Sequence, residues 1–227
     1  MIKDFFNLIF PRCCLACQKA LISDELLICT HCRLELPVTN YHLWEENPLV
    51  MRFYGKITVK EVYSYLKFIK GGITQKVLHK IKYENYPELG QLLVTWFAHD
   101  LIKAQKLLDI ELIVPVPLHK SRLRKRGYNQ SDYIARGIAS ASKVPFSDQV
   151  LERSVKSESQ AMKGDRLERW QNVNKIFKVR RPEEVKEKHI LVVDDVLTTG
   201  ATLEACAMPL LEVECKAISF ATLAVAI

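Results

Sequence analysis

The run Ile190-Leu-Val-Val-Asp-Asp-Val-Leu-Thr-Thr-Gly-Ala-Thr202 limits the possible folds more than any other part of the sequence. Its first four residues are apolar and predict a short buried strand that ends at the two acids. A helix is expected beyond Gly200, with a kink or an early end at Pro209, and a second apolar strand over Ala217–Ala226. A strand, a helix and a strand in this order form a βαβ unit, so the sequence predicts a parallel sheet with helices outside it.

The preceding part of the chain continues the same α/β pattern. Strands are expected over residues 62–68 and 112–116, and helices after Gly71-Gly72, from Glu88 and over Gln130–Ser142. The chain has 227 residues, of which 48% are hydrophobic, and this is enough to bury a sizeable core. No apolar run approaches the roughly 18–20 residues that a membrane span needs, so membrane insertion is not expected.

The two acids and the turn after them also predict a ligand site. Asp194 and Asp195 stand at the carboxyl end of the expected strand, where open α/β sheets bind ligands. Backbone amides, hydroxyls and the helix dipole could form an anion cradle in the turn, which consists of Thr198, Thr199, Gly200, Ala201 and Thr202. The turn lacks the GxxxxGK(S/T) pattern, so it is not a nucleotide-triphosphate P-loop.

Carboxylates repel phosphate, so an acid pair beside an anion cradle needs an explanation. The pairing is reasonable if the ligand carries a phosphate at one end and vicinal hydroxyls near the other. The acids would then accept hydrogen bonds from sugar hydroxyls, as an acid does in dinucleotide-binding folds. A 5-phosphoribosyl group has this shape.

Five of the seven cysteines lie within twenty residues near the N-terminus. The two CxxC pairs, Cys14 with Cys17 and Cys29 with Cys32, have the spacing of a Cys₄ zinc site. Four thiolates leave no open coordination position, so this zinc would be structural. Two alternatives stay open: His31 or Cys13 could replace one ligand, or the pairs could be redox-active.

The first ten residues predict a short docking helix, because their apolar stripe is brief and no cleavage site follows it. A cytoplasmic location is therefore expected. This location argues against disulfides between the cysteines, since disulfides need an oxidising compartment.

The positive charge is concentrated in one segment. Between His119 and His189 there are 18 basic and 9 acidic residues, whereas the remaining chain has 15 basic and 17 acidic residues. An anionic partner, either a polyphosphate or a nucleic acid strand, is expected to bind there. The densest basic run contains Lys120, Arg122, Arg124 and Lys125, which are candidate DNA contacts unless they form only a solvated loop. Tyr128, Tyr133 and Trp170 lie near the charge as candidate stacking groups.

Residues 190–202 resemble the PRPP-binding signature of type I phosphoribosyltransferases. This resemblance implies that Asp194 and Asp195 bind the ribose 2′- and 3′-hydroxyls, and that residues 198–202 hold the 5′-phosphate. The wider chain is similar to the ComF family, whose members join a Cys₄ zinc module to such a domain. The shared features are Pro11, Lys82-Tyr83, Val114-Pro-Val-Pro-Leu118, Arg126-Gly-Tyr-Asn-Gln130, Arg153, Ser159-Gln160 and Arg169-Trp-Gln-Asn172.

The resemblance also implies roles outside the signature. Val116, Pro117 and Leu118 would contact pyrophosphate, with Arg126 beside them. Residues 153–172 are similar to the flexible hood of glutamine-dependent amidophosphoribosyltransferases, which closes over PRPP; the hood candidates are Arg153, Gln160, Arg169 and Asn172. Mg²⁺ is expected to accompany PRPP.

The sequence thus predicts three regions and leaves two functions open. Residues 1–40 would form the N-terminal helix and zinc module, residues 41–58 a linker or cover, and residues 59–227 the phosphoribosyltransferase-like domain. In the first hypothesis the chain binds PRPP or a similar ligand and acts in natural competence, in contact with incoming single-stranded DNA and competence proteins. In the second it is an active phosphoribosyltransferase on an unidentified nucleobase or amine, with no role in DNA handling.

Overall fold

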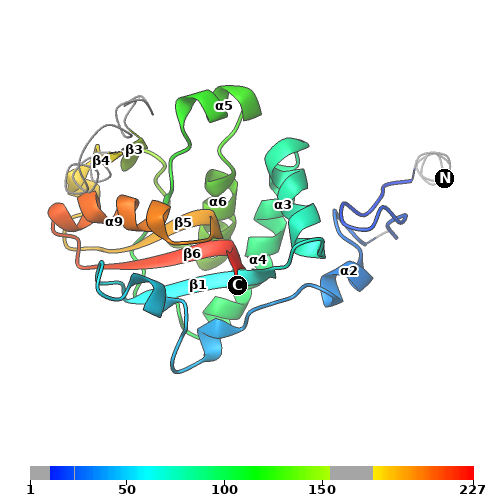
Figure 1. Ribbon diagram of the computed structural model, residues 1–227, viewed down its shortest axis with the longest axis horizontal. Coiled ribbons are helices and arrows are strands. Elements are labelled where there is room, and N and C mark those ends of the chain that lie inside the picture. Colours follow the sequence, from blue (N-terminus) through cyan, green and yellow to red (C-terminus); the bar gives the residue numbers. More distant parts are fainter. Residues whose placement is uncertain (1–10, 23, 154–175) are drawn as a thin grey trace.

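The described part of the chain is built around one parallel sheet. The structure, a computed structural model, describes residues 11–22, 24–153 and 176–227. Four strands pair in the order β1-β6-β5-β2, and each neighbouring pair is parallel (Figure 1). Their bounds are β1 Glu61–Phe68, β2 Leu112–Pro115, β5 His189–Leu197 and β6 Ala217–Ala226. The predicted parallel sheet is therefore confirmed.

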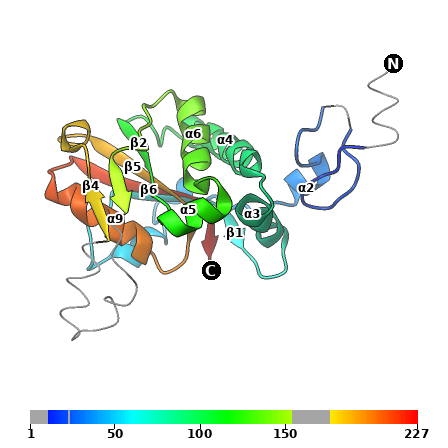
Figure 2. The ribbon, with the colours of Figure 1, turned by 90° about the horizontal axis from the view of Figure 1, so that it is seen from above.

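Helices cover both faces of this sheet (Figures 1 and 2). Leu191 and Val193 of β5 pack in an apolar cluster with α3, α4 and α6, whereas Ile190 and Val192 pack in a second cluster with α9. Successive strand residues point to opposite faces, so a strand buried on both sides is apolar throughout. The helix bounds are α3 Ile73–Tyr83, α4 Pro87–Lys103, α6 Gln130–Ser142 and α9 Ala201–Glu212. The last of these continues beyond Pro209 and does not end early.

The remaining elements are short. They are α2 Thr30–Leu34, α5 Lys120–Arg126, the antiparallel pair β3 Leu151–Arg153 and β4 Phe177–Val179, and 3₁₀ turns at Tyr41–Leu43, Val50–Phe53 and Pro182–Glu184. The basic run that could have been a loop is the helix α5. It ends at Gly127, whose φ of 82° forms a left-handed C-cap, and its Lys, Arg and Leu residues are good helix formers.

The segment that precedes β1 packs onto the sheet. Phe53 is only 1% exposed, and its ring centroid lies 4.8 Å from that of Phe220 in β6. The Asn47 side chain donates a hydrogen bond of 2.7 Å to the Val62 carbonyl. These contacts fix residues 47–53 against β1 and β6, next to the end of the sheet that carries the two acids.

The cysteine-rich region shares an apolar cluster with the α/β domain. Leu15, Ile28 and Leu36 pack in the same cluster as Tyr65 of β1 and Leu78 of α3. Arg33 of α2 also places its guanidinium 4.2 Å from the centroid of the Trp96 ring in α4. Within the described residues, no helix has the length and apolar character needed to cross a membrane.

Candidate functional site

The acid pair lies inside β5, where a strand end was predicted. Asp194 pairs with Thr222 of β6, and the ladder continues to Leu197 opposite Val225. The predicted end of the strand at Val193 is therefore wrong. β6 is ten residues long, so its backbone provides hydrogen-bonding partners beyond the apolar part of β5. The acids are consequently fixed by the sheet backbone on one side.

Side chains from two helices bind the acid pair. Lys82 of α3 places its Nζ 2.9 Å from Oδ2 of Asp195, and Gln130 of α6 donates to the same oxygen at 2.7 Å. Ser131 donates its hydroxyl to Oδ1 of Asp194 at 3.0 Å, and the backbone N–H of Asp195 donates to that oxygen at 2.8 Å. The free protein thus supplies a cation and three hydrogen-bond donors to the two carboxylates.

Sequence reasoning missed these partners of the acids. Lys82 and Gln130 stand out in the sequence only as parts of short motifs, with nothing that links them to Asp195. The link depends on the N-terminus of α6, where Asn129 caps the helix by accepting from the Ser131 N–H. The Asn129 side chain also donates to the Val116 carbonyl at 3.0 Å, which fixes α6 against the end of β2. The fold therefore brings both motifs to one point.

The environment of Asp194 raises its pKa to about 7. Burial is the main cause, and the adjacent Asp195 carboxylate adds to it. The bonds from the Asp195 backbone and Ser131, together with Lys82, lower the pKa and only partly offset these two effects. Asp194 therefore changes its charge near neutral pH.

The turn after β5 forms a small hollow beside the acids. The hollow has a volume of only about 10 Å³, and it is lined by Asp194, Val196, Leu197, Thr198, Gly200, Thr202 and Leu203. Gly200 adopts a φ of 88° just before α9 begins at Ala201. A Cβ at Gly200 would lie 2.9 Å from the Phe53 ring, so the loop needs glycine for its backbone angle and for space. A Gly200→Val change would disturb the loop itself as well as any ligand.

The Arg52 side chain binds the backbone of the turn between β5 and α9. Its guanidinium donates to the Thr198 carbonyl at 2.6 Å and to the Ala226 carbonyl at 2.7 Å. Lys56 forms an ion pair of 3.6 Å with Glu204 in the first turn of α9. The segment from residue 47 to residue 56 therefore positions the predicted phosphate loop. No local sequence signal indicates this, because Arg52 and Thr198 are far apart in the chain.

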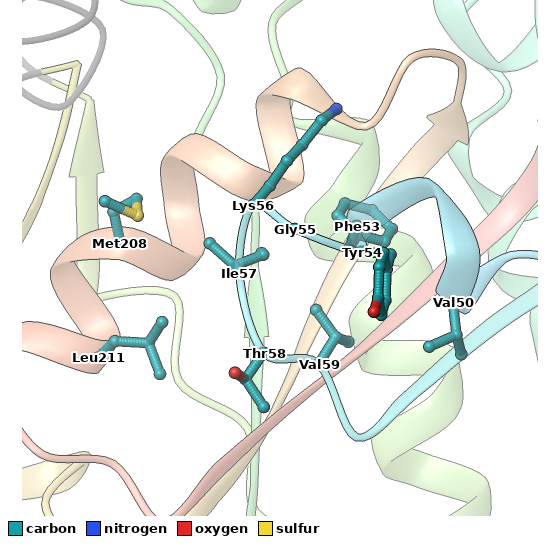
Figure 3. Close-up of a pocket in the computed structure, with 10 residues that line it drawn as sticks. All are labelled: Val50, Phe53, Tyr54, Gly55, Lys56, Ile57, Thr58, Val59, Met208 and Leu211. Carbon is teal, nitrogen blue, oxygen red and sulfur yellow. The ribbon is translucent and has the colours of Figure 1, made fainter.

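Figure 3 shows a larger groove on the other side of the same segment, between residues 50–59 and α9. Its volume is about 610 Å³, and Ile57, Val59, Met208 and Leu211 provide much of its lining. None of the predicted ribose or phosphate residues lines it.

The predicted pyrophosphate-side residues lie close to the acids. Val116 follows β2, is buried, and donates its N–H to the Val193 carbonyl at 2.8 Å. Pro117 and Leu118 are half-buried and lead into α5. Arg126, at the end of α5, donates to the Gln130 side chain at 2.8 Å, and Gln130 in turn binds Asp195.

The predicted DNA contacts Lys120, Arg122, Arg124 and Lys125 are all exposed along α5. Of the hood candidates, Arg153 ends β3 and lies 5.5 Å from the Phe177 ring centroid. Gln160, Arg169 and Asn172 lie outside the described residues, as does Trp170.

The four cysteines of the CxxC pairs meet at one point. The sulfur atoms of Cys14, Cys17, Cys29 and Cys32 lie within 4.8 Å of one another, and those of Cys17 and Cys29 are 3.7 Å apart. Tetrahedral zinc with bonds of about 2.3 Å separates its sulfur ligands by about 3.8 Å, so this cluster fits a structural zinc ion. None of the seven cysteines, all within the described residues, forms a disulfide.

The two residues that could replace a ligand are placed differently. Cys13 is exposed and bonds the Pro11 carbonyl through its thiol at 3.5 Å. His31 is exposed and lies 3.3 Å from the Glu35 carboxylate, in a second grouping that shares Cys32 with the cysteine cluster. The four CxxC cysteines alone form a complete set of four sulfur ligands.

Comparisons with known proteins agree with this architecture. The family model described as "Phosphoribosyl transferase domain" matches residues 123–226, which include the acid pair and the turn after it. The parallel sheet with helices on both faces, together with this match, indicates an α/β protein with a phosphoribosyltransferase domain. The type I phosphoribosyltransferase-like fold class predicted from the sequence is confirmed.

Relatives extend the likeness to most of the chain. The chain is 27% identical over 206 residues to the "DNA utilization protein YhgH" of Escherichia coli K12, covering 87% of this chain and 83% of that protein. It is 23% identical over 203 residues to "Competence protein F" of Haemophilus influenzae, with 84% and 80% covered. It is 26% identical over 153 residues to "Competence protein ComFC" of Bacillus subtilis, with 67% and 58% covered. Over most of its length the chain is therefore similar to competence and DNA utilization proteins.

Solved structures show a weaker likeness. One is titled as the allosteric regulatory enzyme of purine biosynthesis, and another as glutamine PRPP amidotransferase from B. subtilis. Each has a TM-score of 0.45 and 15% identity, and each match covers 63% of this chain. This chain spans only 29% and 30% of those chains.

Proposed function

We propose that this protein binds a phosphoribosyl ligand, PRPP or a close relative, and handles incoming single-stranded DNA in the cytoplasm. The observation that carries the ligand proposal is the acid pair held beside the hollow of the β5–α9 turn. Asp194 and Asp195 would bind the ribose hydroxyls. The 5′-phosphate would occupy the turn formed by Thr198, Thr199, Gly200, Ala201 and Thr202.

The hydrogen bonds on the acids leave room for this ligand. Lys82 and Gln130 both bind Oδ2 of Asp195, and both bonds on Asp194 end at its Oδ1. Among the described hydrogen bonds, the second oxygen of each carboxylate has no donor. Each acid therefore keeps one oxygen for a sugar hydroxyl while its protein partners orient it; Asp194 lines the hollow, and Asp195 is buried beside it at 6% exposure.

Other residues would complete the ligand contacts. Pyrophosphate would bind near Val116, Pro117, Leu118 and Arg126, and Mg²⁺ would neutralise part of its charge when bound. The hood candidates Arg153, Gln160, Arg169 and Asn172 would cover the ligand and exclude water. One structural zinc ion would bind Cys14, Cys17, Cys29 and Cys32.

The proposed DNA contact is α5. Lys120, Arg122, Arg124 and Lys125 are exposed on one short helix in the segment with nine excess positive charges. Basic side chains of this kind neutralise strand phosphates and release counterions. Competence is the role that the names of two relatives indicate, and we extend it to this chain as part of the proposal.

A titration of PRPP with Mg²⁺ into purified protein tests the ligand site. The parent protein should bind, and a variant carrying Asp194→Asn with Asp195→Asn should lose most of the affinity. Because α5 is not part of the ribose site, serine at Lys120, Arg122, Arg124 and Lys125 should leave a ribose 5-phosphate titration unchanged. Equal PRPP binding by the parent and the double Asn variant would contradict the proposal.

Salt dependence tests the DNA role. Affinity for single-stranded DNA should fall by about 0.7 log units per tenfold rise in salt for each neutralised phosphate. The fourfold serine variant should flatten this slope, whereas Asp194→Asn should not weaken DNA binding. A flat response in the parent protein would contradict DNA contact at α5.

An active phosphoribosyltransferase is the second candidate function, because the acid pair and the turn together form a complete site for the transferred group. It would release pyrophosphate from PRPP when the correct acceptor is offered. It also predicts weak DNA binding that does not respond to the α5 changes.

A further inference from the structure

The C-terminal ends of α3 and α5 lie near each other (Figures 1 and 2). The Tyr128 hydroxyl, just after α5, donates to the Ile81 carbonyl in α3. The guanidinium of Arg126 lies 5.2 Å from the centroid of the Tyr83 ring. The last turn of α3 and the last turn of α5 therefore form one continuous surface.

Tyr86, just after α3, is 38% exposed, and Tyr83 is the most exposed aromatic side chain of this surface. It is 64% exposed although it is a large side chain, and its ring lies beside that of His79, with centroids 5.2 Å apart. Arg126 provides a cation–π contact that keeps the ring in place. An exposed aromatic ring fixed by an arginine matches the way that proteins stack the bases of single strands.

The charges around Tyr83 favour binding of the phosphate backbone of single-stranded DNA. The exposed bases of α5 precede Arg126 directly, and Lys76 lies exposed on α3. Glu84 is the acidic neighbour, and it is already paired with Lys80 at 2.5 Å and with His79 at 3.0 Å. Glu88 is a second exposed acid, close enough to Tyr128 to help raise its pKa, but the basic side chains of α3 and α5 outnumber these two acids.

The stacking groups expected from the sequence are placed less well for this purpose. Tyr128 and Tyr133 pack edge to face with centroids 5.8 Å apart, and both are half-buried. The hydroxyl of Tyr128 is used to join α5 to α3. Tyr128 and Tyr133 therefore pack in the contact between α5 and α3, next to Tyr83.

Tyr83 is also linked to the acid pair. Its neighbour Lys82 binds Asp195, and its partner Arg126 binds Gln130, which binds the same carboxylate. A base on Tyr83 would lie at the rim of the predicted ribose site.

We propose that Tyr83, supported by Arg126, stacks a base of single-stranded DNA whose phosphates follow α5. This inference rests on the proposed DNA role and specifies how the strand is recognised. It requires that affinity depends on bases as well as on phosphates.

Fluorescence anisotropy with a labelled oligothymidine and an abasic strand of equal length tests this inference. The parent should prefer the strand with bases, and Tyr83→Leu should weaken its binding by about 5- to 150-fold, as expected for the loss of one stacked base. Tyr83→Leu should bind the abasic strand as the parent does. Tyr54→Leu is the matched control, because Tyr54 is 81% exposed and lies on the separate segment shown in Figure 3.

Tyr83→Trp supplies a direct readout of stacking. Its fluorescence is to be compared with that of the unchanged protein, whose three native tryptophans give the background. Oligothymidine should quench the added signal, and the variant should keep the parent's affinity. If the parent binds the strand but Tyr83→Leu and Tyr54→Leu behave alike, the stacking role is wrong while the DNA role stands. If the parent binds neither strand, the DNA role and this inference fail together.

Discussion

The cysteine cluster and the acid pair both gather groups of like charge or like chemistry, but they are held together in different ways. The four sulfur atoms come from one turn and from the start of α2, and they lie within 4.8 Å of one another. The two carboxylates are met by Lys82, Gln130 and Ser131, which come from two other helices. We therefore expect the cluster to depend on a metal ion for its charge balance, whereas the protein's own side chains offset part of the charge of the acid pair.

This difference predicts that removal of zinc has the largest effect on stability. Cys32→Ser should abolish zinc binding and lower the melting temperature by about 10 °C or more, because structural zinc contributes folding free energy directly. Metal analysis and a thermal melt measure both effects. The shared apolar cluster would transmit part of the loss to the α/β domain.

Cys13→Ser is the matched control for that experiment. Cys13 is exposed and bonds only a nearby backbone carbonyl, so its loss should change neither zinc content nor melting temperature. A full zinc content in Cys32→Ser would show that this cysteine is not a ligand.

Loss of the protein's own cation at the acid pair should have the next largest effect. Lys82→Met leaves the buried Asp195 carboxylate without its ion pair and should lower the free energy of unfolding by about 1–3 kcal/mol. This is less than a fully buried pair would cost, since Lys82 is partly exposed. Denaturant unfolding measures the change.

Lys80→Met provides the comparison on the same helix. Lys80 is exposed to a similar degree, but its partner Glu84 lies on the surface, where ion pairs contribute little. Equal destabilisation by the two substitutions would show that Asp195 does not depend on Lys82.

Arg52→Gln tests whether the phosphate loop is positioned by the segment before β1. Loss of the charged bond to the Thr198 carbonyl should weaken ribose 5-phosphate binding about tenfold. Lys56→Gln, which removes a longer ion pair on α9, should change the affinity much less. Calorimetric titration distinguishes the two variants. Unchanged affinity in Arg52→Gln would show that Arg52 does not position the loop for ligand binding.

The pH dependence of stability tests the raised pKa of Asp194. Its pKa is raised to about 7 in the folded protein, so its contribution to stability is full below pH 4 and is lost as the pH rises through 7. Between pH 5 and 7 this loss amounts to at most about 1.4 kcal/mol per pH unit. Asp194→Asn removes this pH-dependent contribution. The free energy of unfolding of the variant should therefore rise relative to that of the parent protein from pH 5 to pH 8. Parallel pH profiles would contradict the raised pKa.

The same difference explains what the sequence could predict. The CxxC pairs lie close together in the chain, and the acid pair with its turn is one continuous run, so spacing alone indicates both. Lys82, Gln130 and Arg52 act on β5 and its turn across long sequence separations, and only the folded sheet brings them there. The length of β5 was missed because its last pairs depend on the length of β6 rather than on apolar residues.

The central claim is that Asp194 and Asp195 accept hydrogen bonds from the hydroxyls of a phosphorylated ribose. Calorimetric titration with ribose 5-phosphate and with 2-deoxyribose 5-phosphate tests this most directly, because the two sugars share the phosphate and differ by one hydroxyl. The account predicts at least about tenfold weaker binding of the deoxy sugar, as a lost bond to a charged group implies. It also predicts that Asp194→Asn with Asp195→Asn removes most of this difference. Equal affinity of the unchanged protein for the two sugars would contradict the claim.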